Sequence, residues 1–245
     1  MSKFKFLTLG AALLLGGATA TNLHLAAASS LNQVLPELIS TFERQHPEIT
    51  VFVNYGASGS LSQQIKLGAP FDVFLSASPS YIDFLSNFGL VANRQAFARG
   101  KLALFYKRNS DRRIARLNDL IRDEINKIAV ANPQYAPYGQ AALNCLEYYK
   151  IYEKLKPKLV YAASVSQAAQ MAIYSTDAAF IALPLALTQE MLQIGSYLEV
   201  PCDCYRPLIL EAAVIKDSDY ATQFVNFLTT PEALGILRSH GYETP

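Results

Sequence analysis

The chain has 245 residues, enough for one large domain or two lobes, and 51% of them are hydrophobic. Its 21 basic and 20 acidic residues nearly cancel. This balance excludes the strongly basic character of proteins that bind nucleic acid or an anionic membrane surface. Only three cysteines are present, and this odd number argues against a scaffold built from disulfide bonds.

The first twenty residues have the pattern of a secretory signal peptide. Lys3 and Lys5 form a positive start, residues 6–17 are apolar but too few to span a membrane, and Ala18-Thr19-Ala20 fits a cleavage site. No lipobox cysteine is present, so we expect no lipid anchor. We expect cleavage after Ala20 and export to the periplasm. The remaining chain keeps 19 basic and 20 acidic residues and has no further long apolar run, so we expect it to be soluble.

Strands and helices are predicted to alternate along the first half of the chain. Apolar residues from Leu31 to Phe42 recur at helical spacing, and Pro36 should kink or shorten this helix, which ends before His46-Pro47. Further strands are predicted at 49–53, 72–77, 101–107 and 127–130. Further helices are predicted at 61–67, 79–88 and 114–124.

The same alternation continues to the end of the chain. Helices are predicted at 140–155, 165–174, 185–193 and 220–228, and strands at 178–183 and 208–215. A last helix begins after Thr230 as its N-cap, with Pro231 in the first helical position, and ends at Gly241. Alternation of this kind predicts an α/β protein with largely parallel sheets.

Two loops of small residues follow predicted strands. Ser29 and Ser30 follow the apolar run 23–28, and Ser58 lies in the Gly-Ala-Ser-Gly-Ser loop 56–60. Hydroxyls and free backbone N–H groups at the start of a helix favour a bound anion. Neither loop contains an ionisable side chain, so such a site would hold its anion by hydrogen bonds alone. The alternative is that each serine only caps its own helix.

A hydrolase with Ser29 or Ser58 as nucleophile is the competing function. That chemistry needs an activating base, usually a histidine. His24 is five residues before Ser29, but the strand that it begins should carry it away from the loop. His46 ends the first predicted helix and His240 the last one, and no Gly-x-Ser-x-Gly motif is present. We therefore favour a binding protein over an enzyme.

The cysteines indicate no metal site. Cys202 and Cys204 are too close for an easy bridge to each other, and the histidines do not have ligand spacing. We expect buried or half-buried cysteines without a chemical role. A single bridge from Cys145 to the 202–204 segment is the alternative.

Several motifs together resemble the periplasmic molybdate-binding proteins of ABC importers. They are Ala-Ala-Ala-Ser-Ser at 26–30, Gly-Ala-Ser-Gly-Ser at 56–60, Gly-Ala-Pro-Phe-Asp-Val-Phe at 68–74, Asn-Pro-Gln-Tyr-Ala-Pro-Tyr-Gly at 132–139 and the segment 230–242. The resemblance covers the chain that follows the signal peptide, in order and with compatible spacing. It implies a two-lobed periplasmic binding protein fold, type II-like, with a ligand cleft between the lobes. Lobe 1 would comprise residues 21–101 and 210–245, and lobe 2 residues 102–209.

The resemblance also implies the site and the partners. By position, Ser29 and Ser58 match the two serines that bind the oxyanion from the first lobe. Tyr138 and Val165 match backbone donors of the second lobe. The ligand would be molybdate or tungstate, held without direct metal ligands and without a cofactor. The partners would be the permease and ATPase of an ABC importer, and the protein would act as a monomer.

The chain departs from the family pattern at Leu183. Many members have a tyrosine there whose hydroxyl contacts the ligand, and leucine has no donor. Ser30 and the Tyr138 hydroxyl are the candidates to replace it. Another dianionic oxyanion, such as sulfate, is the alternative ligand. A protonated anion such as hydrogen phosphate would need an acceptor, and neither loop has a carboxylate.

Overall fold

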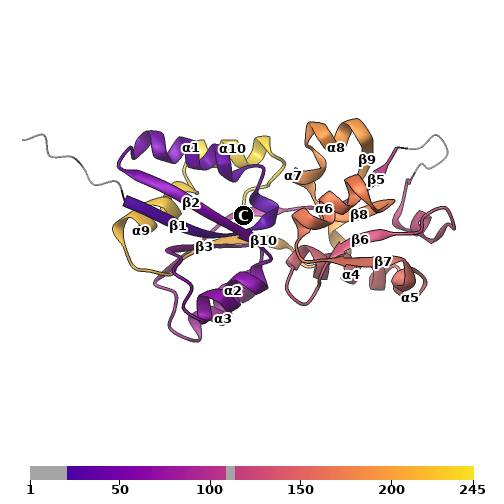
Figure 1. Ribbon diagram of the computed structural model, residues 1–245, viewed down its shortest axis with the longest axis horizontal. Helices are drawn as coiled ribbons and strands as arrows, with labels where there is room; N and C mark the ends of the chain where they lie inside the picture. Colours follow the sequence, from indigo (N-terminus) through magenta and orange to yellow (C-terminus); the bar gives the residue numbers. More distant parts are fainter. Residues whose placement is uncertain (1–20, 109–113) are drawn as a thin grey trace, which may run out of the picture.

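The structure is a computed structural model that describes residues 21–108 and 114–245. The predicted signal peptide, residues 1–20, lies outside the described residues. The described chain forms two lobes side by side, each built around a five-stranded sheet (Figure 1). Lobe 1 is built from the two ends of the described chain, drawn in violet and yellow, and lobe 2 from the middle, drawn in magenta to orange. No described helix is long and apolar enough to cross a bilayer.

The two sheets have the same strand order. In lobe 1 the strands lie in the order β2 (Ile49–Gly56), β1 (Thr21–Ala28), β3 (Val73–Ser76), β10 (Leu208–Val214), β4 (Asn93–Gly100). In lobe 2 the corresponding order is β7 (Leu159–Ala162), β6 (Ile128–Ala131), β8 (Ala178–Ala182), β5 (Leu102–Lys107), β9 (Gly195–Glu199). The α/β alternation predicted from the sequence thus builds two similar lobes.

The sheets are mixed, so the prediction of largely parallel sheets is wrong for one side of each. β1 pairs in parallel with β2 and β3, but β10 is antiparallel to both β3 and β4. In lobe 2, β6 is parallel to β7 and β8, whereas β5 is antiparallel to β8 and β9. The physical reason is the chain path: β5 and β10 each enter their sheet from the other lobe and run against its parallel strands.

Helices cover both faces of each sheet. Lobe 1 contains α1 (Leu35–Gln45), α2 (Ser58–Lys66), α3 (Pro79–Ser86), α9 (Asp219–Phe227) and α10 (Pro231–Ser239). Lobe 2 contains α4 (Pro137–Tyr148), α5 (Tyr152–Leu155), α6 (Val165–Tyr174), α7 (Leu183–Ala186) and α8 (Gln189–Ile194). Short 3-10 helices are η1 (Ser29–Leu31), η2 (Leu117–Ile121), η3 (Lys156–Lys158) and η4 (Cys202–Cys204).

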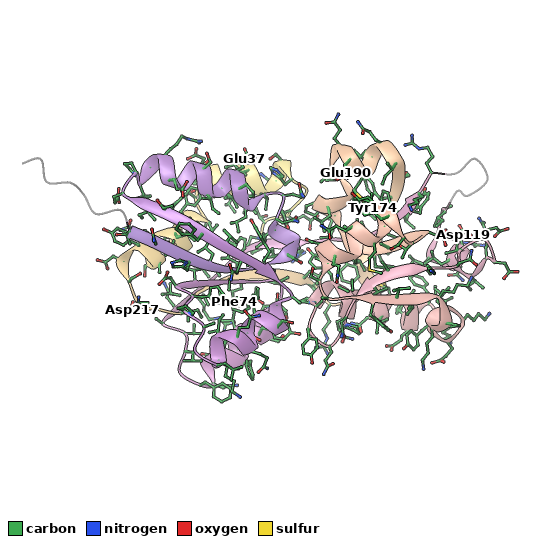
Figure 2. All side chains as sticks on the ribbon, viewed as in Figure 1. Glu37, Phe74, Asp119, Tyr174, Glu190 and Asp217 are labelled. Carbon is green, nitrogen blue, oxygen red and sulfur yellow. A yellow bond between two sulfur atoms is a disulfide. The ribbon has the colours of Figure 1, made fainter. Side chains whose placement is uncertain are left out.

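Side chains that alternate along the central strands give the sheet of lobe 1 two buried apolar faces. On β1, Leu25 and Ala27 belong to the cluster that includes α1 and α9, whereas Ala26 belongs to the cluster formed with α2 and α3. Successive side chains of a strand point to opposite faces, so one apolar strand serves both layers. Phe74 on β3 lies inside lobe 1 on the α2–α3 side, and the charged Glu37 lies on the outside (Figure 2).

The helix predicted at 31–42 starts later than expected. Residues 29–31 form η1, and α1 begins at Leu35 with Pro36 in its first turn. Proline fits the first turn because the N–H it lacks would have no helical partner there. Ser29 and Ser30 therefore lie in a short 3-10 helix and not at the start of α1.

The prediction of one long helix at 140–155 is wrong for its second half. The helix begins earlier, at Pro137, and divides at Lys150, whose φ is 56°. The Ile151 N–H donates to the Leu146 carbonyl across this turn, at 2.9 Å, which closes the helix end. A glycine usually marks such an end, and its absence here is why the sequence indicates one continuous helix.

Two other predicted helices are also shorter. In place of the helix predicted at 114–124, only the 3-10 helix η2 forms. The Asp119 carboxylate accepts the N–H groups of Ala115 and Arg116, at 2.9 and 3.2 Å, which favours a local turn. In place of 185–193, α7 and α8 are separated by Thr188, whose hydroxyl accepts the Met191 N–H at 3.4 Å and caps α8.

Three strands that the sequence does not predict, β4, β7 and β9, all lie at sheet edges. An edge strand is paired on one side only and is partly exposed, so it needs no continuous apolar pattern. β4 illustrates this, because its sequence Asn-Arg-Gln-Ala-Phe-Ala-Arg-Gly carries polar residues through most of its length.

The chain passes between the lobes twice. Lys101 alone separates β4 from β5, and the return runs from Glu199 on β9 to Leu208 on β10. The return segment contains η4, which is tied to α4 by a disulfide between Cys145 and Cys204, with 4.6 Å between their Cα atoms. The favoured prediction of cysteines without a chemical role is therefore wrong for these two, and the alternative bridge is correct. Cys202 is free and exposed.

The first prediction concerns this disulfide. The bridge joins residues 59 positions apart, so it restricts the unfolded chain, and removing a bridge of this kind costs about 2–5 kcal/mol. We expect the Cys145→Ala/Cys204→Ala double variant to lose that much free energy of unfolding in urea titrations without reductant. Cys202→Ala is the matched control and should unfold like the parent protein. An unchanged double variant would contradict the bridge.

Candidate functional site

The carboxyl ends of parallel strands from both lobes meet at the lobe interface. In lobe 1 these ends are Ala28 on β1, Gly56 on β2 and Ser76 on β3, and in lobe 2 they include Ala131 on β6 and Ala162 on β7. In α/β sheets, ligands bind beyond the carboxyl ends of strands. The loops that follow these strands are therefore the place to look for a site.

One small cavity lies among these loops, between the lobes. Its volume is about 10 Å³, close to the smallest that holds one water molecule. All five residues predicted to bind the ligand line it. No Asp, Glu, Lys, Arg or His is among its lining residues, which are Ala28, Ser29, Ser30, Gly56, Ala57, Ser58, Ala77, Ala136, Pro137, Tyr138 and Val165.

Ser58 opens α2 but does not cap it. The N-cap position is Ala57, and no side chain makes a capping bond there. Instead, the Ser58 Oγ accepts the N–H of Ala77, which follows β3, at 3.0 Å in a buried position. Because one lone pair is used in this way, the orientation of the hydroxyl is restricted and its proton is free to donate elsewhere.

Ser29 also has a partner other than its own helix. It lies in η1, again without a side-chain cap. Its carbonyl accepts the Ser166 hydroxyl at 2.7 Å, and its Oγ accepts the Ser166 N–H at 3.4 Å. Ser166 belongs to α6 of lobe 2, so this pair of bonds joins the lobes beside the cavity. The view that Ser29 and Ser58 are only helix caps does not fit these contacts.

Ser30 and Tyr138 contribute buried hydroxyls without a hydrogen-bond partner. Ser30 is 1% exposed and Tyr138 is 2% exposed. In the described part of the chain, neither the Ser30 Oγ nor the Tyr138 Oη makes a hydrogen bond of ordinary geometry, although the Ser30 hydroxyl lies near enough to the phenol to oppose the rise in the pKa of Tyr138. An unpaired buried hydroxyl costs free energy, so two of them lining one cavity point to a ligand with acceptor atoms.

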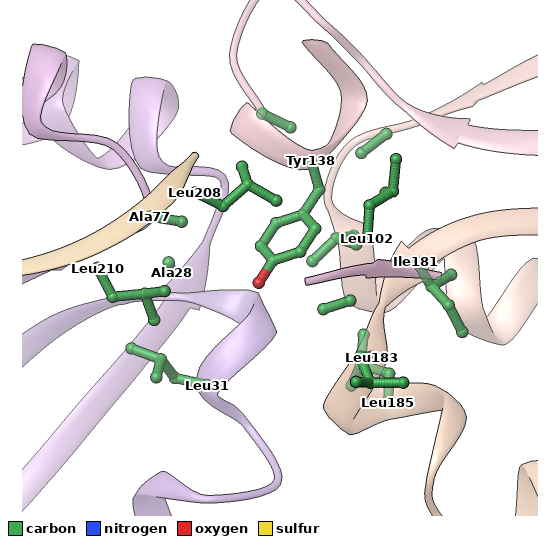
Figure 3. Close-up of a cluster of buried hydrophobic side chains, with 14 of the residues drawn as sticks. Ala28, Leu31, Ala77, Leu102, Tyr138, Ile181, Leu183, Leu185, Leu208 and Leu210 are labelled. Carbon is green, nitrogen blue, oxygen red and sulfur yellow. The ribbon is translucent and has the colours of Figure 1, made fainter. Parts of the chain in front are cut away.

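The Tyr138 ring crosses from lobe 2 into the interface. Figure 3 shows it among apolar side chains of both lobes, including Leu208 and Leu210 of β10 and Leu102 of β5, with its hydroxyl oxygen toward lobe 1. A side chain at Gly100 would collide with that hydroxyl, so glycine is needed there. Burial raises the pKa of Tyr138, so the group remains a protonated donor at neutral pH.

Backbone donors from lobe 2 come from the first turns of two helices. Tyr138 is the second residue of α4, and Val165 is the first residue of α6. The first N–H groups of a helix have no partner within it. The Ser164 hydroxyl accepts the Gln167 N–H at 3.2 Å, which leaves the Val165 N–H for another acceptor.

Two contacts that bring the lobes together have no signal in the sequence. Ser166 contacts Ser29, as described. The Gly59 N–H donates to the Tyr135 carbonyl at 2.8 Å, and a Cβ at Gly59 would lie 2.9 Å from the Tyr135 Cα. Leu183, the departure from the family pattern, begins α7 and is buried without lining the cavity.

The histidines lie away from the cavity. The His24 ring stacks on Phe52, with 5.4 Å between ring centroids, and His240 lies beside the Ile236 carbonyl. Neither they nor His46 line the site, so Ser29 and Ser58 have no adjacent imidazole base. Within the described residues, no three His, Cys, Asp or Glu side chains are arranged to hold a metal ion.

Comparison with known proteins identifies the family. The family model of bacterial extracellular solute-binding proteins matches residues 23–243. The chain belongs to this family. Its similarity to the molybdate-binding protein ModA of Rhodobacter capsulatus is 33% identity, covering 93% of this chain and 96% of that protein. Similarity to ModA of Azotobacter vinelandii is also 33%, covering 96% and 94%.

The fold comparison agrees with the sequence comparison. The solved structure of the Azotobacter vinelandii periplasmic molybdate-binding protein superposes with a TM-score of 0.84 at 30% identity, covering 91% of this chain and 99% of that one. The resemblance inferred from the sequence motifs, and the two-lobed binding-protein fold that it implies, are therefore confirmed.

The second prediction tests the Ser58 contact. Ser58→Ala leaves the buried Ala77 N–H without an acceptor, which costs about 1–3 kcal/mol. We expect that loss of unfolding free energy in urea titrations. Ser60→Ala, on the same helix but half-buried, is the control and should change stability little. Equal stability of the two variants would mean that the Ser58 contact contributes nothing.

Proposed function

We propose that this protein captures molybdate or tungstate in the periplasm and delivers it to the permease and ATPase of an ABC importer. The observation that carries the proposal is the cavity between the lobes, lined by hydroxyls and helix N-termini without any ionisable group except the Tyr138 phenol. The names of the relatives at 33% identity support the choice of ligand.

The donors at this site favour a fully deprotonated anion. Ser29 and Ser58 each already accept a backbone N–H, and the helix N-termini only donate. Hydrogen phosphate carries a proton that would need an acceptor, and the lining side chains offer no carboxylate. We propose that Ser29, Ser30, Ser58, Tyr138 and Val165 bind the oxygens of the anion, with no bond from protein to the metal atom.

The Ser30 and Tyr138 hydroxyls would supply the donor that Leu183 lacks. Both are buried, both line the cavity and both are without a partner. A hydrogen bond to a charged acceptor contributes about 1.5–3 kcal/mol. One or both of these hydroxyls would therefore compensate for the tyrosine found at the Leu183 position in many family members.

Ligand entry requires the lobes to separate. A tetrahedral oxyanion has five heavy atoms, whereas the cavity is close to the size of one water molecule. We propose that the lobes open about the two crossover segments and close on the anion. The movable units would be residues 21–101 with 210–245, and residues 102–209. The crossovers at Lys101 and between Glu199 and Leu208 support this division except at Leu208 and Ile209, which pair with β4 in the sheet of lobe 1.

The proposed role also implies where the protein acts and in what form. The protein would be exported after removal of residues 1–20 and would act as a monomer without a cofactor, catalytic activity or nucleic-acid partner. Sulfate is the second candidate ligand because it is also a dianion without a proton at neutral pH. It differs from molybdate mainly in size.

The third prediction tests ligand choice. A ligand that binds only the folded state stabilises it by mass action. We expect molybdate and tungstate to raise the melting temperature of the protein lacking residues 1–20 by several degrees, and sulfate or phosphate at the same concentration to do much less. Calorimetric titration with the four anions measures the affinities. Equal affinity for sulfate and molybdate would overturn the proposed specificity.

The fourth prediction tests the unpartnered hydroxyls. Ser30→Ala and Tyr138→Phe each remove one donor, and we expect at least one of them to weaken tungstate binding by about 1.5–3 kcal/mol. Folding stability should not fall with Tyr138→Phe, because that hydroxyl has no protein partner to lose. Ser62→Ala removes a buried hydroxyl of α2 that donates to the Gly59 carbonyl outside the cavity, and it serves as control. Unchanged affinity in both variants would exclude the replacement of the Leu183 donor by these groups.

A further inference from the structure

The segment that follows α10 lies at the junction between the lobes. Gly241 has a φ of +85°, and a Cβ there would lie 2.8 Å from the Leu187 Cδ1 of lobe 2. Tyr242 is 2% exposed, and its hydroxyl donates to the Ser30 carbonyl at 2.7 Å. The segment after α10 thus carries a residue, Tyr242, that contacts the serine turn of the candidate site.

The next residue ties this segment to the first crossover. Glu243 exchanges two backbone hydrogen bonds with Arg99 at the end of β4, at 2.8 and 2.9 Å. Its carboxylate lies 2.8 Å from the Lys101 Nζ. Tyr242 is therefore held from both sides, by α10 before it and by the bridge to Arg99 after it.

The bond from Tyr242 restricts one peptide unit of the site. A peptide unit is planar, so the direction of the Ser30 carbonyl also sets the direction of the Leu31 N–H. The Ser166 hydroxyl does the same for the preceding unit through the Ser29 carbonyl, which sets the Ser30 N–H. Two side-chain hydroxyls thus orient two successive backbone donors of the turn that bears Ser29 and Ser30.

The two anchors come from different lobes. Ser166 belongs to lobe 2, so its bond to Ser29 exists only while the lobes are together. Tyr242 belongs to lobe 1, as does the turn, so its bond persists when the lobes separate. Burial raises the pKa of Tyr242 well above its ordinary value, which keeps the phenol a donor.

We propose that Tyr242 is a positioning residue that holds the Ser29–Ser30 turn in its binding geometry before the lobes close. The inference rests on the proposed oxyanion function. A turn that is already ordered costs less free energy to bind a ligand than one that the ligand must order. Tyr242 itself does not line the cavity, so its contribution to affinity acts through the turn.

The binding test compares two variants by tungstate calorimetry at 25 °C. Tyr242→Phe keeps the ring and removes the bond to Ser30, and we expect a rise in Kd of about 5- to 30-fold. Thr41→Val is the control, because it removes a buried hydroxyl of α1 in lobe 1 that accepts a bond from Arg44 away from the site and the crossovers. We expect less than a twofold change there. Circular dichroism checks that both variants are folded at this temperature, so that lost stability alone does not alter Kd.

A double-mutant cycle gives the second part of the binding test. If Tyr242 acts through the turn, its effect should shrink in the Ser29→Ala background, because the two changes concern one unit. Additive effects, an unchanged Kd in Tyr242→Phe, or an equal rise in Thr41→Val would each overturn the proposal. Failure of the parent protein to bind tungstate would instead overturn the proposed function.

Hydrogen exchange of the ligand-free protein tests the positioning role without any ligand. We expect the amides of residues 29–32 to exchange at least about fivefold faster in Tyr242→Phe than in the parent protein, and not in Thr41→Val. Mass spectrometry of a peptide that covers this turn measures the rates. Unchanged exchange in Tyr242→Phe would show that Tyr242 does not hold the turn, whether or not the parent protein binds tungstate.

Discussion

The single residue between β4 and β5 is the constraint on which the arrangement of the site depends. These two strands belong to different sheets, yet only Lys101 separates them. The Lys101 carbonyl accepts the Leu183 N–H at 2.9 Å, and its Nζ lies 3.5 Å from Glu199 and 2.8 Å from Glu243. So short a connection keeps the two sheets adjacent, and the loops after their parallel strands therefore face each other.

The chemistry of the cavity follows from the absence of ionisable side chains other than the Tyr138 phenol among its lining residues. A buried charge without compensation is costly, so a neutral site must offer several hydrogen bonds to an anion. Two groups are oriented before any ligand arrives, because the Ala77 N–H restricts Ser58 and Tyr242 restricts the carbonyl of Ser30. Ser166 restricts Ser29 only when the lobes are together. This order limits the entropy that the proposed ligand would have to remove.

Patterns within single elements could be interpreted correctly from the sequence. The start of α10 at Thr230-Pro231 and the end of α1 before His46 are marked by residues whose effect is local. The edge strands β4 and β9 could not be found in this way, because their partly exposed sequences carry polar residues. The four residues of β7 are apolar, but so short a run does not distinguish a strand from a helix. The division of the 140–155 region at Lys150 was also hidden, since no glycine marks it.

The sequence by itself determined the α/β class, the family, and a set of small neutral residues after two predicted strands. These properties depend on local patterning and on motifs whose spacing survives in the chain. Only the tertiary structure decided that Ser58 and Ser29 are not helix caps, that Ser30 and Tyr138 are without partners, and that Cys145 pairs with Cys204. The reason is that residues far apart in sequence are involved in each case. Which of them come within bonding distance is set by how the elements and lobes pack, and no local preference determines it.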